Sequence, residues 1–357
     1  MKSNAIIITG GALATISAKT AHGLIRGTER FHILAVIDAK NAGKDAGEVL
    51  DGKKRDIPVY ASIEEFSKRS KAKADYCILG LATKGGIIPP ELRLELKQAL
   101  ENGYSLINGL HEYISDIPEL VELARQKGAE IIDVRKPKKF KELHFWSGKI
   151  KEVHCPKIAV LGTDCALGKR TTTRFLVEAM RKAGYKAEMI YTGQTGWMQG
   201  AKYGFVFDST LNDFISGEME HAVYTCYQEA RPDIIFIEGQ SSLRNPSGPA
   251  GSEWICSAAA NAVVLQHNPA RKHYKDMDHY PALVADPEEE IQLIRIYGAP
   301  TVALTINTAA MQVADAREYA KQAQTKLKIP VILPLEDGVE TLVPLFEAMI
   351  KKSMATV

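Results

Sequence analysis

The residues best suited to chemistry form one run, GTDCALGKRTTT, at positions 162–173. The run follows an expected strand and opens an expected helix, which is the context of a phosphate-binding P-loop. Glycines let backbone amides converge, the helix N-terminus adds a partial positive charge, and Lys169 adds a full one. We therefore predict a phosphate site formed by Gly162, Thr163, Asp164, Cys165, Gly168, Lys169, Arg170 and Thr171.

Two features separate this loop from the common form, Gly-x-x-x-x-Gly-Lys-Ser/Thr. Five residues, not four, lie between Gly162 and Gly168, which resembles the loop of dethiobiotin synthetase and its relatives. Arg170 stands where a hydroxyl normally reaches Mg²⁺, and an arginine cannot bind a metal ion. Thr171 would replace that hydroxyl only if the helix began in a shifted register. Because the planar fork of Arg170 matches phosphate oxygens, we expect a phosphorylated compound to be held without Mg-assisted cleavage, and we predict no metal ligands.

Other polar side chains are expected at the same edge of the sheet, because ligands of open parallel sheets bind beyond the carboxyl ends of the strands. Glu238 ends an apolar strand and resembles the metal-serving carboxylate of the dethiobiotin synthetase group, so it is a candidate metal ligand or general base. Gln194 lies in the turn TGQTG, and His267 is able to accept a proton near neutral pH. Asp213 is either a helix cap or a further catalytic carboxylate.

Strands and helices alternate along the chain, which predicts an α/β fold with mainly parallel sheets. The expected strands are 5–9, 32–38, 76–79, 105–107 and 130–134 in the first half, and 157–161, 187–191, 234–238, 262–266, 302–306 and 331–333 in the second. A helix is expected over 12–26. A Lys- and Pro-rich stretch over 135–156 interrupts this alternation of strands and helices. We therefore predict a Rossmann-like domain over 1–150 and a P-loop NTPase-like domain over 151–357.

The N-terminal half also has features of a dinucleotide site. Thr9, Gly10 and Gly11 follow the first expected strand, and Asp38 ends the second. The fingerprint Gly-x-Gly-x-x-Gly is absent, however, because no third glycine lies near the start of the expected helix. An NAD-dependent epimerase is therefore the weaker interpretation of this half.

The composition and charge of the chain argue against some classes of binding partner. The 357 residues carry a net charge of +2, and the basic residues are spread along the chain, so no nucleic-acid partner is expected. No stretch approaches the roughly 20 apolar residues of a membrane helix. Five cysteines without a Cys-x-x-Cys pair are typical of a reducing compartment, and we expect a cytoplasmic homo-oligomer that acts on a small molecule.

The motifs GTDCALGKRTT, TGQTG, EGQSSL, GLHEYISD and DVRKP resemble those of the D-glutamate N-acetyltransferase family over nearly the whole chain. The resemblance implies transfer of an acetyl group from acetyl-CoA to the amino group of D-glutamate, in D-amino-acid catabolism. The P-loop would hold the phosphates of coenzyme A, and Glu238 or His267 would take the proton of the amine. Arg271, Arg244 and Lys202 are the candidate cations for the substrate carboxylates.

Two alternatives remain open from the sequence. An ATP- and Mg²⁺-dependent ligase or kinase of the dethiobiotin synthetase kind would use Thr171 or Glu238 as a metal ligand and release ADP. A non-catalytic nucleotide-binding protein would bind its ligand without turnover.

Overall fold

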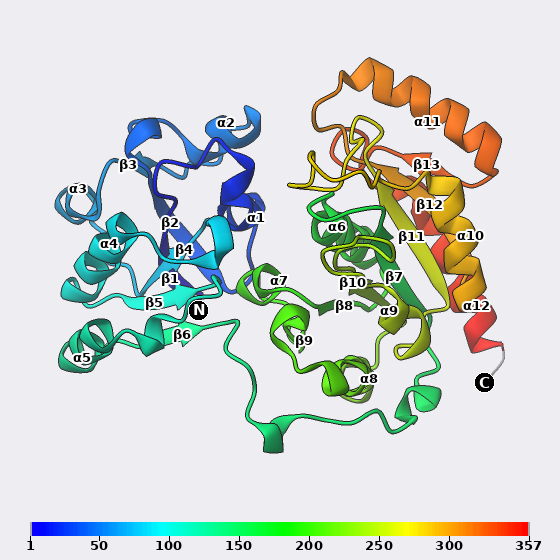
Figure 1. The fold of residues 1–357 in the computed structure, drawn as a ribbon, viewed down its shortest axis with the longest axis horizontal. Helices are drawn as coiled ribbons and strands as arrows, with labels where there is room; N and C mark the ends of the chain where they lie inside the picture. Colours follow the sequence, from blue (N-terminus) through cyan, green and yellow to red (C-terminus); the bar gives the residue numbers. More distant parts are fainter. Residues whose placement is uncertain (1, 356–357) are drawn as a thin grey trace. The chain divides into compact units, whose positions relative to one another are not determined.

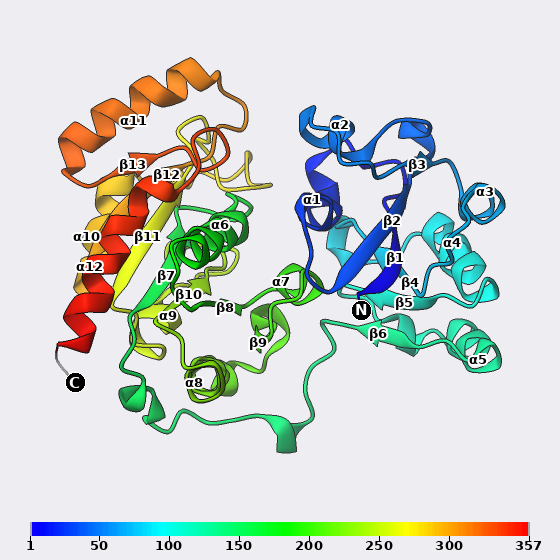
Figure 2. The ribbon, with the colours of Figure 1, turned by 180° about the vertical axis from the view of Figure 1, so that it is seen from behind.

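The computed structural model describes residues 2–355 and divides into two compact units. One unit comprises the chain up to Pro137 together with Gln194–Ala201, and the other comprises Lys138–Gly193 together with the chain from Lys202 onward. Each unit is built on its own parallel sheet, and Figures 1 and 2, which view the chain from opposite sides, show helices on both sides of each sheet. The predicted α/β class and the two parallel sheets are confirmed.

The first unit has the strand order of a dinucleotide-binding fold. Its strands within the described residues are β1 (Ser3–Ile8), β2 (Phe31–Ile37), β3 (Val59–Tyr60), β4 (Tyr76–Leu79), β5 (Ser105–Asn108) and β6 (Ile131–Asp133). They lie in the order β3-β2-β1-β4-β5-β6, and every pair is parallel. This is the order 3-2-1-4-5-6 of the doubly wound fold.

Helices bury both faces of this first sheet. They are α1 (Lys19–Arg26), α2 (Ala46–Asp51), α3 (Ile63–Arg69), α4 (Pro90–Glu101), α5 (Pro118–Lys127) and the short α7 (Gln194–Met198). Alternate residues of β1 enter different cores: Ile6 and Ile8 pack with residues of α3, α4 and α5, whereas Ala5 and Ile7 pack with residues of α1, α2 and α7. A strand buried on both sides explains the continuous apolar run in the sequence.

The expectation of one helix over 12–26 is wrong in its first half. Gly10 and Gly11 have φ values of +54° and +79°, so the chain turns after β1 instead of entering a helix. A 3₁₀ turn at Ile16–Ala18 follows, and α1 begins only at Lys19. The strand therefore does not lead directly into a helix N-terminus, as it does in a dinucleotide-binding loop.

The second unit is a larger parallel sheet. Its strands within the described residues are β7 (Lys157–Gly162), β8 (Ala187–Tyr191), β9 (Tyr203–Gly204), β10 (Ile234–Glu238), β11 (Ala262–His267), β12 (Thr301–Ile306) and β13 (Val331–Ile332), in the order β13-β12-β11-β7-β10-β8-β9. The helices are α6 (Lys169–Lys182), α8 (Asn212–Ala230), α9 (Ser252–Cys256), α10 (Pro287–Tyr297), α11 (Val313–Leu327) and α12 (Val343–Met354). Residues of α6 and α12 share one core with the sheet, and residues of α8 to α11 share the other.

The stretch after Pro137 belongs to the second unit, whereas the predicted division lay near residue 150. Two buried carboxylates of α8 hold it. Glu218 accepts hydrogen bonds from Lys138 Nζ (2.5 Å) and from both the amide (3.0 Å) and Nδ1 (2.8 Å) of His144. Glu220 in turn accepts from the amide and hydroxyl of Ser147. These contacts fix a stretch that the sequence presents as a connection without regular structure.

Candidate phosphate-binding site

The P-loop lies at the point in the second sheet where strand order changes direction. The strand before it, β7, is flanked by β11 on one side and β10 on the other. The carboxyl ends of these strands therefore meet at one edge, with those of β8 and β12 beside them. This is the position at which open α/β sheets bind ligands.

The loop ends in a helix N-terminus without a side-chain cap. Gly168 is the N-cap of α6 at φ +97°, and a glycine has no side chain with which to cap the first turn. The first-turn amides of an α-helix have no partner inside the helix, so they are donors for an anion. Because α6 begins at Lys169, the register is not shifted, and Arg170 occupies the position that normally carries the metal-binding hydroxyl.

Lys169 lies folded over its own loop. Its Nζ donates to the carbonyl oxygens of Asp164 (2.6 Å) and Ser241 (2.8 Å), and the residue is only 5% exposed. Burial lowers the pKa of Lys169 to about 8, although the charges of Cys165 and Asp164 act in the opposite direction. An anion bound at the loop would give this ammonium a better partner than two neutral carbonyls.

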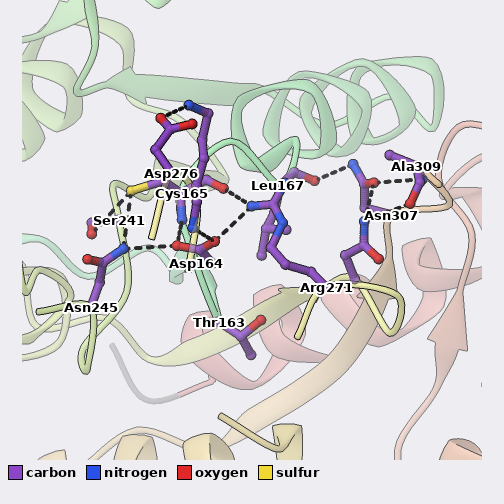
Figure 3. Close-up of polar contacts among 12 residues, drawn as sticks. Thr163, Asp164, Cys165, Leu167, Ser241, Asn245, Arg271, Asp276, Asn307 and Ala309 are labelled. Carbon is purple, nitrogen blue, oxygen red and sulfur yellow. Dashed lines mark hydrogen bonds and ion pairs between the residues drawn. The ribbon is translucent and has the colours of Figure 1, made fainter. Parts of the chain in front are cut away.

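Asp164 is the centre of the hydrogen-bond network around the loop (Figure 3). Its side chain is 0% exposed. One carboxylate oxygen accepts from the amide of Cys165 (2.6 Å) and from Asn245 Nδ2 (2.9 Å). The other accepts from Arg271 Nη1 (2.8 Å) and from the amide of Lys275 (2.9 Å). The loop is thus connected to segments far apart in the sequence.

Glu238 lies at the end of β10 and is 4% exposed. Burial raises its pKa to about 7, and the positive charge of Arg170, the amides of Thr192 and Gly193, and Lys169 oppose that rise. The amide of Thr192 donates to its carboxylate over 3.2 Å. A carboxyl group of this kind exchanges a proton near neutral pH, as a general base requires.

His267 is joined to the P-loop but is poorly suited to proton transfer. Its Nδ1 shares a hydrogen bond of 2.9 Å with Thr163 Oγ1. Burial lowers the pKa of His267 to about 4, so the ring is neutral over the physiological range. Its neighbour Gln266 accepts from the hydroxyl of Thr172 over 2.6 Å, which ties α6 to β11. Through these contacts, His267 helps to hold the P-loop in place.

The remaining predicted residues make other contacts. Arg244 forms ion pairs with Glu289 (2.9 Å) and Glu290 (3.1 Å) of α10. Lys202 pairs with Glu229 over 2.7 Å at the surface. Asp213 is exposed in the first turn of α8, where its charge favours the helix dipole. Gln194 belongs to the first unit, where its side chain accepts from Arg135 Nη2 over 2.9 Å.

Three residues that contact the loop had no role in the sequence-based prediction. Asn307 follows β12 and donates to the carbonyl of Leu167 over 2.9 Å. Asn245 donates to Asp164, and the carbonyl of Ser241 accepts from Lys169. Asn307 lies directly after a predicted strand, so the rule that identified Glu238, which looks for polar residues at strand ends, would also have identified Asn307.

In the first unit, the carboxylate that would bind a dinucleotide ribose accepts hydrogen bonds from the chain itself. Asp38 is 1% exposed and accepts hydrogen bonds from the hydroxyl of Thr9 (2.7 Å), the amide of Leu13 (2.9 Å) and both the amide (3.1 Å) and Nδ2 (3.0 Å) of Asn41. A carboxylate with four internal donors has little capacity left for ribose hydroxyls.

The substitution Asp38→Asn is therefore expected to lower the free energy of unfolding of the first unit by about 1–3 kcal/mol, because an amide cannot accept from all four donors. Chemical denaturation followed by circular dichroism measures this. Asp75→Asn is the control, because the Asp75 side chain is exposed and accepts from the amide of Asn4 over 2.8 Å, so an amide oxygen is able to take over this contact. An Asp38→Asn protein as stable as the control, together with stabilisation of the wild type by NAD, would restore the dinucleotide interpretation.

Across residues 2–355, no group of three or more His, Cys, Asp or Glu side chains is arranged to hold a metal ion. None of the helices in that same part of the chain combines the length and apolar character of a membrane span.

The fold and the loop define an α/β protein with a Rossmann-like unit and a P-loop unit. Residues 144–343 match the P-loop domain of the DUF1611 family, described as a domain of unknown function, and residues 39–137 match the Rossmann-like domain of the same family. The chain belongs to this family. A crystal structure of a DUF1611 family protein from Anabaena variabilis is 30% identical, with a TM-score of 0.87 and coverage of 98% of this chain and 100% of that one.

Two curated relatives carry the name D-glutamate N-acetyltransferase. The one from Tritonibacter scottomollicae is 27% identical over 349 residues, which is 96% of this chain and 98% of the relative. The one from Pseudoalteromonas sp. is 28% identical over 279 residues, which is 77% of this chain and 82% of the relative. The resemblance inferred from the sequence motifs is thereby confirmed at the level of the family.

Proposed function

We propose that this protein is an N-acetyltransferase that moves an acetyl group from acetyl-CoA to the amino group of D-glutamate. The observation that carries the proposal is that a buried carboxyl group, Glu238, and an arginine in the metal-binding position, Arg170, occur at the same P-loop. A buried carboxyl group with a pKa of about 7 lies within electrostatic reach of a P-loop that has arginine in the metal-binding position. The names of the two curated relatives supply the acceptor and the reaction.

The donors of the loop suit coenzyme A. An uncapped helix N-terminus, Lys169 and Arg170 offer amide and cationic donors, and coenzyme A carries a pyrophosphate and a 3′-phosphate. Acetyl transfer breaks the thioester and leaves these phosphates intact. A loop without the metal-binding hydroxyl is therefore compatible with this reaction, whereas cleavage of a phosphoanhydride ordinarily needs the metal ion.

In the proposed reaction, Glu238 is the general base. The ammonium group of the acceptor loses a proton to the Glu238 carboxylate, and the amine nitrogen attacks the thioester carbonyl carbon. The carbon–sulfur bond then breaks, and the thiolate of coenzyme A leaves and takes up the second proton of the attacking nitrogen, which gives the neutral amide and the free thiol. Because Glu238 lies on the strand next to the P-loop, the proposal requires the pantetheine arm to fold back toward this sheet edge from the phosphates.

Glu238 is a better base than His267 at neutral pH. The two candidates were equal on sequence, but burial moves their pKa values apart, to about 7 for Glu238 and about 4 for His267. A base is most effective when its pKa is near the working pH. The candidate cations for the acceptor carboxylates, Arg271, Arg244 and Lys202, each already form an ion pair with a carboxylate of the chain.

The direct test is mass-spectrometric detection of product from acetyl-CoA and D-glutamate, with L-glutamate and with ATP and Mg²⁺ in parallel reactions. We expect N-acetyl-D-glutamate without ATP, and little product from L-glutamate. Mass detection avoids the background that five cysteines would give with a thiol-reactive dye. ADP release without any acetylated product would contradict the proposal.

That outcome would support the second candidate, an ATP- and Mg²⁺-dependent ligase or kinase. The observation in its favour is the position of Glu238 at the end of a strand beside the P-loop, where a carboxylate is able to serve a metal ion. Binding of CoA or ATP with no turnover of either would instead indicate a nucleotide-binding protein without catalysis.

A further inference from the structure

We propose that Arg271 is a positioning residue that shapes the P-loop through Asp164, and that it does not itself contact the bound phosphates. Arg271 is the one predicted substrate cation that the structure brings to the loop. Its Nη1 donates to the carboxylate of Asp164 over 2.8 Å and to the carbonyl of Cys165 over 2.6 Å. Both acceptors belong to the loop itself (Figure 3).

The first reason concerns charge. Asp164 is fully buried and lies within the very loop that is to bind an anion. An uncompensated carboxylate there would be costly to bury and would repel a phosphate ligand. The guanidinium of Arg271 forms an ion pair with this carboxylate, whereas the hydrogen bonds from Cys165, Asn245 and Lys275 come from neutral groups. Lys169 also interacts with the charge of Asp164, but its ammonium donates to the carbonyl oxygen of that residue.

The second reason concerns the backbone. Ala166 has a φ value of +50°, a conformation that is unfavourable for a residue with a Cβ. The carbonyls on both sides of it are held by side chains: Arg271 holds that of Cys165, and Asn307 holds that of Leu167 over 2.9 Å. Strained backbone persists where surrounding contacts determine it, so Arg271 is expected to maintain the curl that presents the loop amides to an anion.

The third reason is that the Arg271 side chain is already engaged and largely buried. It is 18% exposed, and its partner Asp164 is 0% exposed. The amide of Lys275 reaches the same carboxylate oxygen, so the segment that carries Arg271 is fastened to the loop at two points. A phosphate contact through Nη1 would require Arg271 to leave Asp164 and to expose that buried charge without a partner. Nε and Nη2 make neither of these two bonds, and the variants below separate positioning from a contact through them.

Binding of CoA, measured by isothermal titration calorimetry, separates positioning from direct contact. Arg271→Met is expected to weaken binding by roughly 10- to 100-fold, and Arg271→Lys by less, because a lysine keeps the charge but loses the second hydrogen bond. The double variant Asp164→Asn/Arg271→Met is expected to recover at least part of the loss, since no unpaired carboxylate remains. Arg317→Met, which breaks an exposed ion pair with Asp337 in the same unit, is the control and should bind CoA normally.

A double variant that binds no better than Arg271→Met would overturn the proposal, because removing Asp164's charge cannot restore a lost contact with the ligand. Ala166→Gly gives a second check: in the Arg271→Met background it should strengthen binding, because glycine adopts positive φ without strain. In steady-state kinetics, Arg271→Met should raise KM for acetyl-CoA far more than it lowers kcat. A change in kcat alone would also contradict a positioning role.

The inference rests on the proposed function only for the identity of the ligand. If the wild type binds ADP and not CoA, the acetyltransferase proposal fails, and the same variants are compared with ADP. Hydrogen–deuterium exchange over residues 163–169 needs no ligand at all. Exchange there should rise in Arg271→Met and fall again in the double variant. Unchanged exchange in Arg271→Met would show that Arg271 does not hold the loop.

Discussion

The substitution Glu238→Gln is expected to lower kcat for acetyl transfer by about 100- to 10,000-fold, the usual contribution of a general base. Glutamine has nearly the same shape and keeps an oxygen that accepts from the amide of Thr192, so the local structure should survive. It cannot accept the proton of the ammonium group. KM for acetyl-CoA should change little, because the phosphate contacts assigned to the P-loop remain. Steady-state kinetics with D-glutamate measures both constants.

The pH dependence of kcat/KM tests whether the carboxylate form of Glu238 is the active one. The pKa of Glu238 is raised to about 7, and only the carboxylate form acts as a base. In the wild type, kcat/KM should therefore fall as the pH decreases through about 7, and Glu238→Gln should lose this limb. The matched control is Glu218→Gln, a buried glutamate of α8 that holds Lys138 and His144. The control should be less stable yet keep the acidic limb, and a profile of Glu238→Gln parallel to that of the wild type would remove Glu238 from the role of base.

The sequence was sufficient to predict the parts of the fold that repeat. Strands buried on both faces are continuous apolar runs, so β4, β8 and β10 have the predicted bounds, and the other long strands differ by a residue or two. The P-loop was found because its chemistry is local: glycines, a lysine and a helix start lie within twelve residues. The position of Glu238 at the sheet edge was predictable because the end of a parallel strand is a defined place in the fold.

The features missed depend on contacts between distant segments. The edge strands β3 and β9 have two residues each and are too short for a hydrophobic pattern. The TGQTG turn gave no sign that Gln194–Ala201 would join the first unit, where Gln199 Nε2 donates to the carbonyls of Gly23 (2.7 Å) and Gly27 (2.9 Å). Likewise, Asp164 and Arg271 are 107 positions apart, and only the folded chain shows that they form a pair.

The difference between Glu238 and His267 also needed the structure. Both residues end strands at the same sheet edge, and both are ordinary acid–base candidates by type. Burial acts on them in opposite directions, because it disfavours the charged form of each group, which is the carboxylate of one and the imidazolium of the other. The depth of burial, which the sequence does not give, therefore decides which of the two is a base at neutral pH.

Lys169→Met is expected to make the protein more stable and nearly unable to bind acetyl-CoA. Burial lowers the pKa of Lys169 from 10.5 to about 8, which corresponds to a cost of about 3 kcal/mol for keeping the ammonium in the folded protein at pH 7. The cost is fully present below pH 8 and disappears as the pH rises toward 10.5, where the unfolded chain also loses the proton. Methionine removes the charge but leaves the carbonyls of Asp164 and Ser241 without this donor, so we expect a net gain of about 1–3 kcal/mol at pH 7.

Loss of a charge that pairs with phosphate in a buried site should raise KM for acetyl-CoA by about 100-fold or more. Lys157→Met is the matched control, because Lys157 lies at the opposite end of β7, is 4% exposed and donates to the carbonyl of Val153 over 3.0 Å. Burial lowers its pKa as well, so its loss should also affect stability, but KM should not change. Urea denaturation at pH 7 and pH 10 and steady-state kinetics test both statements. A Lys169→Met protein that is less stable than the wild type at pH 7 and has an unchanged KM would show that this lysine is a structural residue, and that coenzyme A is held elsewhere.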